Sequence, residues 1–525
     1  MPRKSLRRYI SVMILAPGKF ANFIKLSLLL FSIALSFVYG GPLGAQVALR
    51  VGVSGLPPSL GNPYTANGIP SAYYWHAIFD TLTVIESDGR LVGALATDWE
   101  RIGPTTWRFG LRKGVTFSNG KRFDSTAVAA TLRWLTSNEG VSTLVGNEIR
   151  HIALIEALEP YSVVIHTRIP DPILPKRMAA VFIFEPSAWE RLGPEGFALK
   201  PVGSGSFELE AWRDGLGRSV LLATPNSWRP AAIDRLEFAI IPDLMSRLQA
   251  LISGQIDLAT ALAPDAVEDL DFQKYTVHTS FLPGVNSLAF RTVNNKLSPV
   301  INRSVRQALN LAVDKNSLSA VLAHGRTKPG GQGATATAFG FNPDVKPYPY
   351  DPERARELLA AAGYAGGFKL TAEAVTGDRG EETLIYQSVA QNLREVGVEL
   401  EIRSISNATF LQKYVTGSFE TDMFSLTWNT APLYDAFRPL EYFSCARTNP
   451  FFCETTVIPK LEAARIELDS ISRLEMLRDL QVEYHALAPA IFLLEVIVLS
   501  VSTKLLENVP FRSTVPIFHE IRLSR

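Results

Sequence analysis

Strand patterns and helix patterns alternate along this chain, and this alternation most constrains its fold. Residues 106–111 alternate large apolar side chains with polar or small ones, which is the period of a half-buried strand. Residues 352–362 repeat apolar side chains at helical spacing behind Asp351, a good N-cap. A second helix pattern, 384–396, leads directly into a strand pattern at 398–402. The sequence therefore predicts an α/β fold.

Turn and cap signals mark where other elements begin and end. Residues 118–121 read Ser-Asn-Gly-Lys and predict a turn, after which Asp124 caps a helix running through Trp134. Two stretches are predicted to be loops, 329–342, rich in Gly, Ala and Thr, and 429–435.

Size and composition exclude several classes of protein. The chain has 525 residues, enough for two to four structural units. Hydrophobic residues make up 47% and the formal net charge is +1, which excludes global disorder and disfavours a nucleic-acid binder. Only one apolar run approaches membrane length, so a polytopic membrane protein is disfavoured as well.

The first 45 residues have the pattern of a secretory signal peptide. No Asp or Glu precedes Asp80, six basic residues fall in the first 25 positions, and an uncharged run follows at 26–39. Folded as a helix, that run would be only ~21 Å long, whereas the hydrocarbon core of a membrane is ~30 Å thick. The length therefore favours cleavage near Ala45 or Gly40 over a retained membrane anchor. We expect an exported, periplasmic protein. Cleavage at Ala45 would leave 46 Lys and Arg against 51 Asp and Glu, a mildly acidic chain.

Export would determine the redox state of the two cysteines. Cys445 and Cys453 flank a turn signal at Asn449 and Pro450. In an oxidising compartment we expect them to form one local disulfide, worth about 2.5 kcal/mol on the chain-entropy model. A metal site would need further ligands, and no His lies within thirty residues on either side.

Catalytic motifs are missing from the sequence. It contains no HExxH, no GxSxG and no phosphate-binding GxxxxGK[ST]. A GxGxxA match at 331–336 follows Pro329-Gly330 rather than a strand, so it does not indicate dinucleotide binding. The seven His show no paired metal spacing and are interpreted as structural or surface residues. We predict a binding protein rather than an enzyme, with no cofactor and no metal.

Seven ordered blocks of the chain resemble the extracellular solute-binding proteins of family 5, the peptide- and nickel-binding class that serves ATP-binding-cassette importers. The resemblance spans about 48–525, and its most specific block is VRQALNLAVDK at 305–315. The other blocks are FDTL at 79–82, GALATDW at 93–99, TWRFGLRKGVTFSNG at 106–120, PVGSGSF at 201–207, LISGQIDL at 251–258 and YDPERARELL at 350–359.

The resemblance implies a two-lobed periplasmic-binding-protein fold of type II, cluster C, with an extra subdomain on the N-terminal lobe. Lobe I is expected to comprise 46–80, 195–285 and 495–525, the extra subdomain 81–194, and lobe II 286–494. Two crossing segments would join the lobes around a cleft that closes on the ligand like a hinge.

The implied function is the capture of a peptide or similar small polar solute for a membrane permease, by a monomer that binds no nucleic acid. Alternatives of the same class are an anionic non-peptide solute, such as an opine or sugar phosphate, and a metal–chelator complex. An exported hydrolase and a ligand-sensing partner of a membrane receptor are further alternatives.

The resemblance also implies where the ligand lies, beginning with a loop that follows Trp428. Dipeptide- and oligopeptide-binding relatives carry an Asp three residues after this Trp, which neutralises the ligand's amino terminus. Here that position is Ala431, which weakens the case for a free-amine peptide, although Asp435 could substitute. Arg379 is the nearest match to the relatives' carboxylate-binding Arg, offset by a residue or two; the alternative is a solvent-facing loop residue.

Other candidate contacts come from both lobes. Trp428 and Tyr434 could form an aromatic wall that faces Trp75 and its two neighbouring tyrosines, and Asn429 of the same loop is a further candidate contact. The alternative is that Trp75 and Trp428 only complete the core. Asn286 and Arg291 flank the strand expected near the hinge. Relatives usually have Asn where Arg291 stands, which points to a negatively charged ligand.

Overall fold

The computed structural model describes residues 47–65, 68–293, 295–376 and 381–524. Two predictions, the signal peptide at 1–45 and the ligand contact of Arg379, therefore lie outside the described residues. Ala48–Arg525 forms one compact unit. Among the helices that the structure describes, none combines the length and apolar content needed to cross a membrane.

A ten-stranded sheet runs through this unit in the order β14-β13-β15-β12-β16-β11-β1-β10-β9-β8. Its strands are β1 (Ala48–Val53), β8 (Phe207–Ala211), β9 (Ser219–Ala223), β10 (Arg235–Ile240), β11 (Leu258–Leu262), β12 (Tyr275–Phe290), β13 (Phe368–Val375), β14 (Val398–Ile405), β15 (Met423–Asn429) and β16 (Ala490–Thr503).

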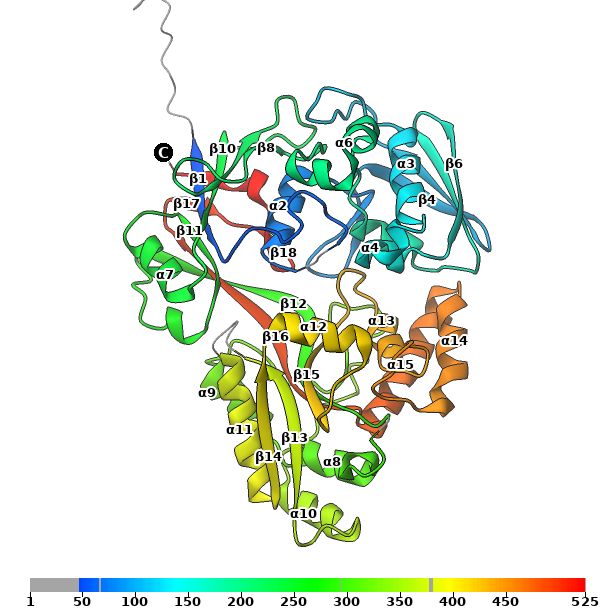
Figure 1. Cartoon of the computed structure of the whole chain (residues 1–525), viewed down its shortest axis with the longest axis vertical. Helices are drawn as coiled ribbons and strands as arrows, with labels where there is room; N and C mark the ends of the chain where they lie inside the picture. The colour runs from blue at the N-terminus through cyan, green and yellow to red at the C-terminus, as the bar shows by residue number, and fades with distance from the viewer. Residues whose placement is uncertain (1–46, 66–67, 294, 377–380, 525) are drawn as a thin grey trace, which may run out of the picture. The chain divides into compact units, whose positions relative to one another are not determined.

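The long strands β12 and β16 are the two segments that join the lobes (Figure 1). They pair antiparallel from Tyr275 opposite Thr503 to Ala289 opposite Ala490, with register shifts on both sides of Val285. β16 also pairs with β11 of lobe I, and β12 with β15 of lobe II. The lobe boundaries expected from the sequence, 285/286 and 494/495, fall inside these two strands, where a shift in register allows the pair to bend.

Lobe I combines parallel and antiparallel pairing around a core rich in aromatic side chains. β1 lies parallel to both β10 and β11, and helix α7 connects the latter two strands. A separate four-stranded sheet, β4-β5-β7-β6, lies within the range expected for the extra subdomain. The remaining elements of this half are α2 (Ser71–Ile78), β2 (Thr83–Ile85), β3 (Leu91–Gly93), β4 (Ala96–Gly103), β5 (Thr106–Leu111), α3 (Ser125–Leu135), α4 (Leu144–Glu148), β6 (Ile152–Glu159), β7 (Ser162–Thr167), α5 (Leu174–Arg177), α6 (Pro186–Leu199), α7 (Leu244–Ile252), β17 (Leu506–Asn508), β18 (Phe511–Arg512), β19 (Val515–Pro516) and β20 (Arg522–Leu523).

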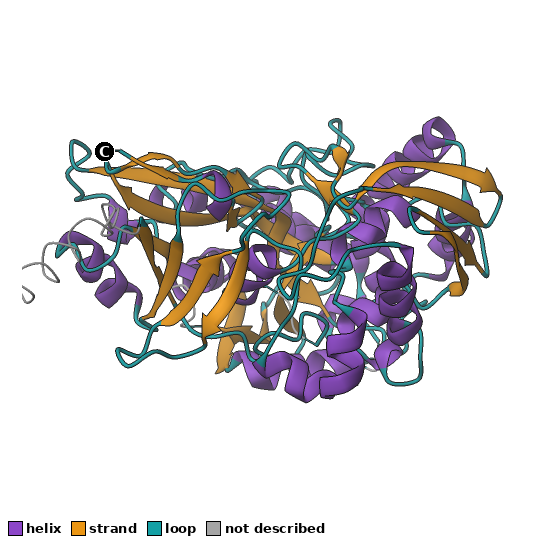
Figure 2. Cartoon of the chain, turned by 90° about the horizontal axis from the view of Figure 1, so that it is seen from above, coloured by secondary structure: helices purple, strands orange, loops and turns teal. Residues whose placement is uncertain are grey.

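Lobe II has a parallel pair, β13 and β14, connected through helix α11. Helices and strands are interspersed through the molecule, as Figure 2 shows. The helices of this half are α8 (Arg303–Leu311), α9 (Lys315–Leu322), α10 (Pro352–Ala361), α11 (Glu381–Glu395), α12 (Asn407–Thr416), α13 (Phe437–Tyr442), α14 (Ile458–Ile466) and α15 (Ser470–Leu487).

The local predictions from the sequence are confirmed with small shifts at the ends. The strand at 106–111 is β5, and the helix pattern over 384–396 belongs to α11, which begins three residues earlier. Asp124 and Asp351 cap their helices by accepting the amide hydrogens of Thr126 and Arg354. The expected disulfide between Cys445 and Cys453 is present, with a Cα–Cα distance of 4.6 Å.

Candidate functional site

A cavity of about 320 Å³ lies where both lobes meet the crossing strands. Lobe I contributes α2, β2 and the hairpin β18–β19, and lobe II contributes the loop after β15. Leu282 of β12 and Val498 of β16 complete the lining. The volume is in the range of small-molecule sites. We refer to this cavity as the cleft cavity.

The lobe II wall is the loop after β15, and hydrogen bonds hold it against the hinge. Asn429, Ala431, Pro432 and Tyr434 line the cleft cavity. Both the amide and the hydroxyl of Thr430 donate to the carbonyl of Pro283 in β12, at 3.0 and 2.9 Å. Because this carbonyl belongs to a crossing strand, the loop is tied directly to the segment that joins the lobes.

The lobe I wall is built from α2 and the C-terminal hairpin. Ala72 and His76 lie one turn apart in α2 and face the cavity with Arg512 from the end of β18. The Glu86 carboxylate accepts from Arg512 Nη2 at 3.1 Å and from Nε at 3.4 Å. Ser87 also accepts from the Ser513 amide, so the turn after β2 fixes the hairpin in place.

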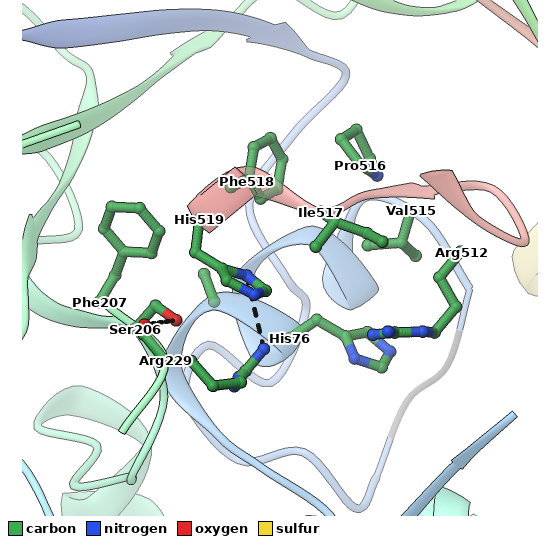
Figure 3. Close-up of a pocket in the computed structure, with 11 residues that line it drawn as sticks. His76, Ser206, Phe207, Arg229, Arg512, Val515, Pro516, Ile517, Phe518 and His519 are labelled. Atoms are coloured by element: carbon green, nitrogen blue, oxygen red, sulfur yellow. Dashed lines mark hydrogen bonds between the residues drawn. The ribbon is translucent and has the colours of Figure 1, made fainter. Parts of the chain in front are cut away.

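Charged groups of both signs gather behind this wall, where a smaller cavity of about 150 Å³ shares His76 and Arg512 with the cleft cavity. Figure 3 shows His76 and Arg512 side by side, with Arg229 next to His519. Burial lowers the pKa of His76 to about 3, and the Arg512 and Arg229 guanidiniums add to the shift. The pKa of His519 is lowered to about 3 in the same way. Both imidazoles are therefore neutral near pH 7.

Two of the residues predicted as ligand contacts, Asn429 and Tyr434, are brought to the cleft cavity. Tyr434 is nearly buried, and burial raises its pKa despite a hydrogen bond with Ser513 and the nearby Arg512. Its hydroxyl therefore stays protonated and joins the loop of lobe II to the hairpin of lobe I. That these two residues contact the ligand stays a prediction.

Three other predicted contacts lie behind the walls. The Trp428 ring stacks on Phe443 with centroids 3.5 Å apart, in the core of lobe II. Trp75 packs in the lobe I core and donates from Nε1 to the Leu60 carbonyl at 2.9 Å. Asp435 is 0% exposed. In this conformation all three residues occupy core positions, and a ligand contact of any of them stays a prediction.

The carboxylate of Asp435 is used inside lobe II. It accepts from Arg473 Nη1 and Nη2 at 2.7 and 2.9 Å, in a bidentate pair. Burial by itself would raise the pKa of Asp435, but Arg473 and Lys176 hold it below its ordinary value. In this conformation Asp435 does not substitute for the carboxylate that is missing at Ala431.

Asn286 and Arg291 lie on β12 and just after it, but neither lines the cleft cavity. Asn286 accepts from the Thr427 hydroxyl at 2.9 Å, across the β12–β15 pair. Arg291 donates from Nε to the Thr421 carbonyl at 2.7 Å, at the far end of β15. A ligand role for either residue remains untested.

Sequence reasoning missed the lobe I wall. Arg512 lies between Pro510 and Pro516 in a short hairpin, a signal for an exposed turn that was available in the sequence. His76 was interpreted as structural or surface, and only the fold shows that it lines the cavity.

Ion pairs link the lobes beside the cleft cavity. Glu148 of α4 accepts from Arg438 of lobe II at 3.1 Å and from Arg177 of lobe I at 3.4 Å. Burial opposes the ionised form of Glu148, but the two guanidiniums lower its pKa. Lys176 donates to the Tyr434 carbonyl at 3.2 Å. An interlobe cavity of about 350 Å³ next to these pairs has charged walls, but its acidic groups are mostly paired with arginine.

A metal centre finds no support in the described part of the chain. No group of three or more His, Cys, Asp or Glu residues there could hold a metal ion. A fold of two lobes around a cavity at their crossing strands instead defines a reversible binding protein of the hinge-closing class.

Comparison with known proteins agrees with this class. The profile of the bacterial extracellular solute-binding proteins, family 5 (middle), matches residues 90–450. The glutathione-binding protein GsiB of Escherichia coli K12 is 26% identical over 349 residues, which cover 66% of this chain and 67% of GsiB.

Solved structures share the fold. NikA from Brucella suis, in complex with Fe(III)-EDTA, superposes with a TM-score of 0.78 at 22% identity, covering 91% of this chain and 100% of NikA. DppA from Helicobacter pylori, an ABC transporter-associated periplasmic binding protein in complex with the peptide STSA, gives 0.76 at 21% identity, covering 91% of this chain and 99% of DppA.

The chain belongs to the bacterial extracellular solute-binding proteins of family 5. It is a substrate-binding protein of the class that serves ATP-binding-cassette importers, and the two-lobed α/β fold expected from the sequence is confirmed.

Proposed function

We propose that this protein captures a peptide or peptide-like solute in the cleft cavity and presents the closed form to a membrane permease. One observation carries the proposal. The cleft cavity is lined by both lobes and by both crossing strands, so a bound solute contacts every part that moves when the hinge bends. Contacts that form only in the closed state make closure depend on the ligand.

The relatives support the nature of the solute. GsiB binds glutathione by name, and DppA was solved with a peptide. NikA holds a metal chelate, and that alternative remains open for this chain, as do opines and sugar phosphates. GsiB and DppA are binding proteins by name, so we propose binding without chemistry on the solute. We also propose export to the periplasm through the segment at 1–45.

A solute panel combined with a blocked cavity tests this function. Ala72→Trp would place an indole in the cleft cavity from α2, whereas Ala361→Trp adds the same group on the exposed face of α10. We expect a solute from a panel of peptides, sugar phosphates and metal chelates to raise the unfolding temperature of the wild type and of Ala361→Trp. The shift should vanish in Ala72→Trp. A shift that survives in Ala72→Trp would place the binding site elsewhere.

A further inference from the structure

The cleft cavity is apolar along most of its lining and charged at one end. Apolar side chains come from each of its contributing parts: Ile69, Val84, Leu282, Pro432 and Val498. Among the described residues that line it, Arg512 is the one with a formal charge near neutral pH, because His76 is neutral there. A ligand that fits this lining therefore has an apolar body and one polar end.

Arg512 lines the cleft cavity and is held by a carboxylate along one edge of its guanidinium. Glu86 occupies the edge formed by Nε and Nη2. The second edge, formed by Nη1 and Nη2, has no carboxylate against it among the described ion pairs. A guanidinium has five N–H donors in a planar fork, so one carboxylate leaves room for another. Glu86 also fixes the plane of the fork, which lowers the entropy lost when an anion binds.

Groups of both charges lie behind Arg512, together with two neutral imidazoles. Arg229, His76 and His519 surround the same wall (Figure 3). Three carboxylates also line the smaller cavity behind this wall: Asp80 is engaged by Arg229 and by the Trp228 indole, Glu86 is paired with Arg512, and Glu520 lies 3.7 Å from His519 Nε2. Arg512 is therefore the charged group that the wall of lobe I presents to the cleft cavity, and the carboxylates of Asp80 and Glu86 behind it are already paired.

A free ammonium group has no counter-charge in this cavity. None of the described lining residues is Asp or Glu, and the nearby Asp435 is buried against Arg473. Placing an unpaired ammonium against apolar walls is strongly unfavourable. An amide meets no such penalty, since the Asn429 side chain and the Thr514 hydroxyl at the lining can hydrogen-bond to it.

Resting on the function proposed above, we propose that the solute is an N-acylated amino acid or short N-acylated peptide with apolar side chains, whose carboxylate binds the Nη1–Nη2 edge of Arg512. The carboxylate anchors the solute on lobe I. The acylated nitrogen and the apolar groups fill the rest of the cavity up to the loop after β15.

Three matched libraries test this assignment by affinity selection and mass spectrometry. One holds N-acetyl dipeptides with free carboxylates, the second the same N-acetyl dipeptides as C-terminal amides, and the third the same dipeptides with free amines and free carboxylates. We expect the wild type to enrich members of the first library at least 10-fold over their counterparts in both others. Arg512→Gln should reduce the preference for carboxylate over amide to near 1, and Arg512→Lys, which keeps the charge but not the fork, should retain part of it.

Arg403→Gln is the matched control, because Arg403 lies exposed on β14 with an acidic partner of its own. Thermal unfolding of each variant shows whether it is folded. Equal enrichment of free-amine peptides, or an unchanged carboxylate preference in Arg512→Gln, would overturn the assignment. If no library is enriched but another solute of the panel binds in a manner blocked by Ala72→Trp, this assignment fails and the proposed function stands. If Ala72→Trp blocks nothing, the proposed function fails as well.

Discussion

The two walls of the cleft cavity use their charged residues in opposite ways. In lobe II the loop after β15 ends in Asp435, whose carboxylate is fully paired with Arg473 inside the core. In lobe I the hairpin carries Arg512, which is paired with Glu86 along one edge only. A charge that is neutralised on all sides holds a fold together, whereas a charge with a free edge at a cavity can bind a ligand. Whether a residue lies in a family motif does not tell a structural charge from one that can bind a ligand. The hydrogen-bond and ion-pair partners of the charged group do.

The largest effect that tests this comparison is on stability. Asp435→Asn keeps the volume of the side chain but leaves the buried Arg473 without its counter-charge. We expect a loss of about 3–5 kcal/mol in the free energy of unfolding, measured by urea denaturation. The control Glu401→Gln removes an exposed partner of Arg403 and should cost less than about 1 kcal/mol. A loss below about 1 kcal/mol for Asp435→Asn would show that this carboxylate is not needed by the fold and is available to a ligand.

The second effect is on the pH dependence of the free energy of unfolding, through His76 of lobe I. The pKa of His76 is lowered from an ordinary value of 6.5 to about 3, so the unfolded chain takes up a proton that the folded chain does not. The stability from neutral His76 is complete above pH 6.5 and is lost as the pH falls from there toward 3.

His76→Gln removes this proton uptake. Between about pH 5.5 and 4, the slope of unfolding free energy against pH should become shallower by about 1.4 kcal/mol per pH unit. His519→Gln should act in the same direction, because the pKa of His519 is lowered by the same causes. An unchanged slope in His76→Gln would mean that burial at the lobe I wall does not keep His76 neutral in the folded chain.

The smallest effect concerns contact between the walls. Arg438→Gln breaks the ion pair with Glu148 that links the lobes. We expect the bound solute to be held about 5–30-fold more weakly, or about 1–2 kcal/mol, because the closed form loses a contact that the open form lacks. Titration calorimetry measures this change, with Arg403→Gln as the control. Equal affinities would show that this pair does not contribute to closure.

The sequence predicted the fold well because its signals are local. Asp124 and Asp351 cap helices through neighbouring amides, and the alternation at 106–111 needs only a sheet face. The cleft was harder to predict. Tyr434 lines the cleft cavity, but its neighbour Asp435 turns into the core and pairs with Arg473, which lies 38 positions away in the sequence. The partnership of Arg512 with Glu86 spans 426 positions, a distance over which local patterns carry no information.

The central claim is that a solute draws the two walls together. Spin labels on Glu100→Cys in lobe I and Glu399→Cys in lobe II report the distance between exposed sites, while the native disulfide keeps Cys445 and Cys453 unlabelled. Pulsed electron spin resonance, with the tightest binder of the solute panel at saturation, should give a shorter and narrower distance distribution than the free protein. In the Arg512→Gln variant, the distances between the spin labels should shift toward this distribution only at a higher solute concentration. An unchanged distribution, with saturation confirmed by calorimetry, would contradict the account.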